Sequence, residues 1–67
     1  MTSINSKHND WDVTVVETED GWYAVASHTQ YGEIDTRDAM PKRDTAEAAE
    51  LAIVSWADDI EADPALQ

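Results

Sequence analysis

The spacing of apolar residues changes once along this chain, and that change most constrains what the chain can fold into. Between Trp11 and Ser27, apolar and polar residues alternate with the period of two that is typical of half-buried strands. From Thr45 the stretch TAEAAELAIVSWADDIEA places apolar residues at helical spacing and is rich in helix formers. The order predicts strands first and then one C-terminal helix.

The dipeptide Asp20-Gly21 interrupts the alternation and is favoured in two-residue hairpin turns, because their central positions need positive φ. With these residues as the loop, Val16 is expected opposite Val25. One face of the hairpin then carries Trp11, Val13, Val15, Trp22, Ala24 and Ala26. The other face carries Thr14, Val16, Thr18, Tyr23, Val25 and Ser27. We expect the first face to form the core, because its alanines let a helix lie close.

A short third strand is predicted after Gly32, where the sequence EIDT places Ile34 inward and Glu33 and Asp35 outward. Residues 37–43 are expected to form a connecting loop, because the proline in this stretch disfavours a helix. The sheet is therefore predicted to be complete before the helix begins.

The helix is expected to begin at Asp44, because Glu47 follows three residues later in the pattern of a capping box. It is expected to end before Pro64. Its apolar stripe consists of Ala46, Ala49, Ala52, Ile53, Trp56, Ala57 and Ile60. We expect this stripe to pack on the core face of the hairpin.

These elements predict one α+β domain over residues 10–63, a three-stranded antiparallel β-meander with the C-terminal α-helix packed on one face. Residues 1–9 are expected to form a flexible tail and residues 64–67 a frayed C-terminus.

Acidic residues dominate the charge of the chain. Fifteen acidic and four basic side chains give its 67 residues a net charge of −11. Such a charge repels nucleic acid and anionic membranes and attracts basic protein surfaces, so we expect neither direct nucleic-acid binding nor membrane binding. The lack of cysteine, of a signal sequence and of a membrane-spanning stretch favours the cytoplasm. Salt adaptation or simple solubility is an alternative explanation of the acidity.

One helix covers one face of the sheet and leaves the other uncovered, with Val16, Tyr23 and Val25 beside Glu33 and Asp35. A wet face is usually more polar than this strip, so we expect a contact there with another protein or with a second copy of the chain. Tyr23 and Val25 are the candidate apolar anchors. On the helix, residues 51 and 54 lie off the core stripe, where they either contact the loop 37–43 or form an apolar spot ringed by acids.

Paired carboxylates on these elements are candidates for contacts with lysine and arginine. Neighbours on one face of a strand or helix lie about 5–7 Å apart, which is similar to the spacing of successive phosphates in nucleic acid. The candidate residues are Glu33, Asp35, Glu47, Glu50, Asp58 and Glu61.

No catalytic or metal-binding pattern stands out. His8 and His28 lack the spacing of metal ligands, and there is no thiol and no Gly-rich phosphate loop. A domain this small leaves little room for a cleft in which a carboxyl pKa is shifted for acid–base chemistry. We therefore predict a protein without catalytic residues, metal or cofactor, and not an enzyme.

The pattern VTVVETEDGWYAV, followed by a loop and DTAEAAELA, resembles the partial ribonuclease-H-like domain of HicB-type antitoxins. The matching positions lie within about two-thirds of the chain and are Glu19, Asp20, Gly21, Tyr23, Asp44, Thr45, Glu47 and Ala48. SHTQYGEIDT stands in place of that family's Pro-Asp-Leu-Pro-Gly segment. The resemblance implies an antitoxin or a small toxin-neutralising domain that acts as a dimer through the open sheet face.

In size, charge and lack of cysteine the chain also resembles, as a class, phage-encoded inhibitors such as anti-CRISPR and anti-restriction proteins. This resemblance implies a non-enzymatic inhibitor in the host cytoplasm that binds the basic, nucleic-acid-recognising surface of a CRISPR–Cas or restriction protein as a DNA mimic. It is the leading hypothesis. The HicB-like antitoxin and a salt-adapted small scaffold protein are the alternatives.

Overall fold

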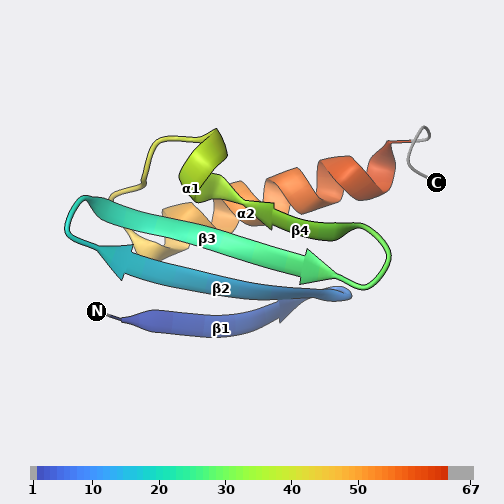
Figure 1. The fold of residues 1–67 in the computed structure, drawn as a ribbon, viewed down its shortest axis with the longest axis horizontal. Coiled ribbons are helices and arrows are strands. Elements are labelled where there is room, and N and C mark those ends of the chain that lie inside the picture. The colour runs from blue at the N-terminus through green and yellow to red at the C-terminus, as the bar shows by residue number, and fades with distance from the viewer. Residues whose placement is uncertain (1, 64–67) are drawn as a thin grey trace.

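The protein has two layers, a single antiparallel sheet and a helix that crosses one of its faces (Figure 1). The computed structural model describes residues 2–63, so the frayed end predicted for residues 64–67 lies outside the described residues. The elements in chain order are β1 (Ser3–His8), β2 (Trp11–Thr18), β3 (Gly21–His28), β4 (Gly32–Asp35), α1 (Thr36–Ala39) and α2 (Ala46–Ala62). The order of strands in the sheet is also β1-β2-β3-β4.

The prediction of a three-stranded meander is wrong, because the sheet has four strands. The additional strand is β1, which lies in the segment expected to be a flexible tail and pairs with β2 along its whole length. The polar sequence of β1 concealed it, since Ile4 is its one large apolar side chain. The pairing depends on the main-chain ladder and on polar contacts such as Thr14 Oγ1 to Asn5 Oδ1, at 3.0 Å.

The β2–β3 hairpin has the predicted faces but a different register. Its two-residue loop is one position earlier than predicted, and Thr18 pairs with Gly21. Val16 therefore lies opposite Tyr23 instead of Val25. A shift of two positions between partners preserves the alternation of side chains. For this reason the faces were predicted correctly although the partners were not.

The core lies between the sheet and α2. Its buried apolar residues are Trp11, Val13, Val15, Ala24, Ala26, Ala49, Ile53 and Ala57. They come from the predicted core face of the hairpin and from the predicted stripe of the helix. Small alanine side chains on both layers allow the helix to approach the strands closely.

Helix α2 begins after Thr45, whose Oγ1 accepts a hydrogen bond from the Ala48 N–H at 3.1 Å, so the predicted cap at Asp44 is wrong by one residue. Val54 packs against the core, whereas Leu51 is 69% exposed and is not covered by the preceding connection. That connection is also more regular than the predicted loop, because its first residues form the one-turn helix α1.

A buried threonine joins α1 to the sheet. Thr36 is 4% exposed, and its Oγ1 accepts from the Ala24 N–H at 2.9 Å and donates to the Ala24 carbonyl at 3.2 Å. The ladder between β3 and β4 ends at the pair Val25↔Asp35. The hydroxyl of Thr36 therefore provides the hydrogen bonds that a longer β4 would have made.

Candidate binding surfaces

The face of the sheet that α2 leaves uncovered is called the open face here. Its strand register arranges the side chains in three rows across the sheet. The first row is Lys7, Asp12, Ser27 and Glu33, the second is Asn5, Thr14, Val25 and Asp35, and the third is Ser3, Val16 and Tyr23. Val16, Tyr23 and Val25 form an apolar strip at the centre. The carboxylates of Glu33 and Asp35 border this strip at the β4 edge.

A guanidinium group lies on the open face beside these residues. The Cζ atom of Arg37 is 5.1 Å from the centroid of the Tyr23 ring, a cation–π arrangement. The same guanidinium bonds to Asp35, with Nη2 at 3.1 Å from Oδ2. The other oxygen of Asp35 accepts the backbone N–H of Arg37 at 2.7 Å and so caps α1. The sequence offered no signal for the contact with Tyr23, because it depends on how α1 folds back over β3.

The four predicted carboxylates of α2 lie on the other layer, and three of them contact the strands. These contacts join β1 and the start of β2 to α2, and they are Ser6 Oγ to Glu50 Oε1 (3.3 Å), His8 Nε2 to Asp58 Oδ1 (2.8 Å) and Trp11 Nε1 to Glu61 Oε1 (2.8 Å). The fourth carboxylate, Glu47, is exposed. The helical acids therefore help to hold the edge strand in place.

The predicted site residues are thus divided between two surfaces. Tyr23, Val25, Glu33 and Asp35 are together on the open face. The four acids of α2 are on the opposite layer. That these groups contact a partner stays a prediction, but no single flat partner surface can reach both.

The C-terminal half of α2 is rich in acidic residues. Asp58, Asp59 and Glu61 lie near the negative end of the helix dipole, and no basic residue occupies the last turn. Acid at this end of a helix is unfavourable, and like charges three or four residues apart repel each other. Asp58 and Glu61 are used in the contacts with His8 and Trp11, whereas solubility in salt or attraction of a cationic partner explains the placement of Asp59.

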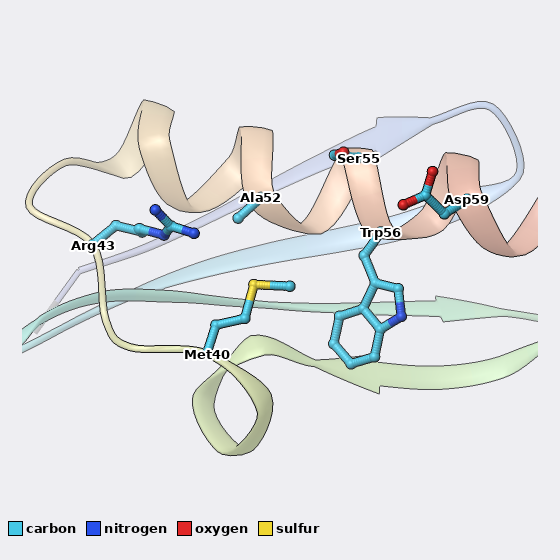
Figure 2. A pocket seen from close by; sticks show the side chains of 6 residues that line it. All are labelled: Met40, Arg43, Ala52, Ser55, Trp56 and Asp59. Carbon is cyan, nitrogen blue, oxygen red and sulfur yellow. The ribbon is translucent and has the colours of Figure 1, made fainter.

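A pocket of about 260 Å³ opens between α2 and the segment that follows α1. Its lining residues are Met40, Arg43, Ala52, Ser55, Trp56 and Asp59. Figure 2 shows the Met40 side chain, which comes from the end of α1, next to the Trp56 indole, which extends from α2. Ligand pockets usually hold about 300–1,000 Å³, so this one suits a single apolar side chain. Sequence reasoning missed it because it assigned residues 52 and 56 to the core stripe.

The described residues form no recognisable catalytic arrangement. His8 contacts Asp58, but the nearby Ser6 hydroxyl donates to Glu50 and is not hydrogen-bonded to the imidazole, as a nucleophile would be. Within residues 2–63, no three histidine or carboxylate side chains come together as a metal site. In the same part of the chain, no helix has the length and apolar character that crossing a membrane requires.

Comparison of the chain with known protein families, with curated proteins and with solved structures found no match. The geometry and charge of this chain are therefore the basis for inferring its function.

Proposed function

We propose that this protein is a non-enzymatic inhibitor that occupies a basic nucleic-acid channel of a bacterial defence protein, of the CRISPR–Cas or restriction type, in place of the nucleic acid. The observation that carries the proposal is the distribution of acid over both layers of an elongated body. None of the fifteen acidic side chains is buried. Docking on a flat surface would need acid on one face, whereas acid on both faces suits a channel that surrounds its ligand.

The dimensions and charge of the body support this comparison with a duplex. The body measures 37 × 20 × 16 Å, and one turn of DNA is about 34–36 Å long. Duplex DNA carries one negative charge per about 1.7 Å, hence about 22 over the 37 Å length of this body. The net charge of −11 is about half of that. A basic channel attracts such a ligand over distance and accelerates its association.

Competition with DNA tests the proposal. The immobilised chain is exposed at low salt to a lysate of cells that carry a DNA-targeting defence system, and bound protein is eluted with a short DNA duplex or with NaCl. We expect release by both, because the duplex competes for the channel and salt screens the charged pairs. A bound protein that resists both eluents would contradict the proposal.

Two charge-neutralising variants distinguish a surrounding channel from a flat docking site. Glu33→Gln changes the open face and Glu47→Gln changes α2, and both side chains are exposed. In a channel, each variant should weaken binding by a similar factor of about two to five. A loss confined to one variant would assign the contact to that face alone and contradict the channel.

The apolar strip of the open face favours a second candidate, a HicB-like antitoxin that acts as a dimer. Val16 and Tyr23 are cross-strand partners, and Val25 extends the strip. Covering these side chains would remove apolar surface from water. Sizing chromatography separates the candidates, since a stable dimer whose target binding is indifferent to DNA supports the antitoxin and a monomer contradicts it.

A further inference from the structure

The contact of Arg37 with Tyr23 and Asp35 is a small, well-defined guanidinium site on the open face. The ring of Tyr23 supplies the π surface at 5.1 Å from Cζ, and the carboxylate of Asp35 supplies a hydrogen-bond acceptor at 3.1 Å from Nη2. Asp35 is the more enclosed of the two charged partners, with 21% of its side chain exposed against 52% for Arg37. The acceptor is thus fixed in the surface, while the guanidinium lies on top of it.

The site does not depend on the side chain that now occupies it. Asp35 Oδ1 is held at 2.7 Å by the backbone N–H of Arg37, a group that any residue except proline provides at that position. Tyr23 is held by its strand between β2 and β4. Removal of the Arg37 side chain should therefore leave both the ring and the carboxylate in place.

We propose that Tyr23 and Asp35 form a recognition site for an arginine side chain of the partner, and that Arg37 occupies this site in the free protein. The inference rests on the proposed function and gives the chemistry of the partner residue at this position. An arginine of a nucleic-acid channel stacks on a base and binds a phosphate through its planar fork. Tyr23 offers it a ring in place of the base, and Asp35 a carboxylate in place of the phosphate.

The same geometry discriminates against lysine. A guanidinium is planar and weakly hydrated, so it stacks on an aromatic ring and bonds a carboxylate at the same time, whereas an ammonium is a compact, strongly hydrated charge. Arg37 also acts as a competitor within the chain. The apparent affinity for a partner arginine is lowered by the fraction of time that Arg37 occupies the site.

Titration with two short peptides tests the inference, one carrying two arginines and the other two lysines in the same glycine framework. The ring resonances of Tyr23 are followed by NMR at low salt. In the unmodified chain we expect the arginine peptide to shift them and the lysine peptide to leave them nearly unchanged. In Arg37→Ala the arginine peptide should bind about five-fold more tightly, because the internal competitor is gone.

Arg43→Ala is the matched control, since it removes the same charge from the side chain that lines the pocket by α2. An equal gain in both arginine variants would reflect net charge alone and would overturn the inference. Tyr23→Leu should lose the preference for arginine, with its fold checked by the amide spectrum. If that variant fails to fold, the comparison of the two peptides on the unmodified chain decides.

Failure of the arginine site is distinguishable from failure of the proposed function. Equal binding of the two peptides would overturn the arginine site, while release of the bound protein by a DNA duplex would still support the channel proposal. A preference for the arginine peptide, without release of the bound protein by a DNA duplex, would support the arginine site and contradict the channel proposal.

Discussion

The close approach of Gly21 to the segment before α2 gives the sharpest prediction about stability. Gly21 has φ +132°, and a Cβ atom added there would lie 2.5 Å from the carbonyl oxygen of Arg43. That carbonyl accepts the N–H of Trp22 at 2.8 Å, and the Arg43 N–H donates to the Trp22 carbonyl at 2.8 Å. Gly21→Ala therefore strains the backbone and pushes away a segment that is paired with β3.

The magnitude follows from these two effects. A side chain at such a φ costs about 1–3 kcal/mol, and the loss of two backbone hydrogen bonds costs about 1 kcal/mol each. We expect Gly21→Ala to lower the free energy of unfolding by about 3–5 kcal/mol. A domain of this length has a total free energy of unfolding of about 3–10 kcal/mol, so the variant should be marginally folded or unfolded.

Gly32→Ala is the control. Gly32 also has positive φ, at +87°, but nothing lies within 4 Å of its added Cβ. Gly32→Ala should therefore lower the free energy of unfolding only by the cost of the backbone conformation, about 1–2 kcal/mol. Urea unfolding followed by tryptophan fluorescence measures both variants, and urea is preferred because guanidinium salt would screen the charge of this acidic chain. Equal losses in the two variants would refute the steric argument.

Three further predictions concern stability and are measured in the same way. Thr36→Val should cost about 2–3 kcal/mol because it leaves both backbone groups of Ala24 without their partner, whereas Thr36→Ser, which keeps the hydroxyl, should cost about half of that or less. Ile53→Ala should cost about 2–5 kcal/mol because Ile53 is fully buried. Leu51 is exposed, so Leu51→Ala should cost under about 0.5 kcal/mol. Similar losses in the two variants would contradict the assigned core. Ala62→Lys should raise the free energy of unfolding by about 0.5–1 kcal/mol at low salt, because it places a cation at the acidic end of α2. Ala62→Gln is the neutral control, and a gain that persists in molar NaCl would rule out this electrostatic cause.

The parts of the fold that were predicted correctly have a local periodic signal. Alternation assigned Trp11, Val13 and Val15 to the core face, and a wrong register between partners did not disturb that assignment because the shift was two positions. The helical stripe identified Ile53 for the same reason. Such signals need only a few neighbouring residues.

Strand β1 and the cap of α1 lacked such a signal. SINSKH has one large apolar residue, so nothing in its composition distinguished an edge strand from a tail. Asp35 was predicted to face outward, which the register agrees with, but its hydrogen bond to the Arg37 N–H depends on the turn of helix that follows. The pocket beside Trp56 was missed because it forms only where the connection that follows α1 lies beside α2.

Local patterns in the sequence were enough to predict which side chains share a face, that a long helix follows the strands, and that the surface is acidic, because alternation, helical spacing and charge are properties of adjacent residues. Only the folded arrangement of the segments shows that β1 joins the sheet, that Gly21 approaches Arg43, that the acids divide between two layers, and that Arg37 lies on Tyr23. Each of these features depends on how two distant segments pack against one another. The local sequence of one segment does not indicate where the other segment will lie.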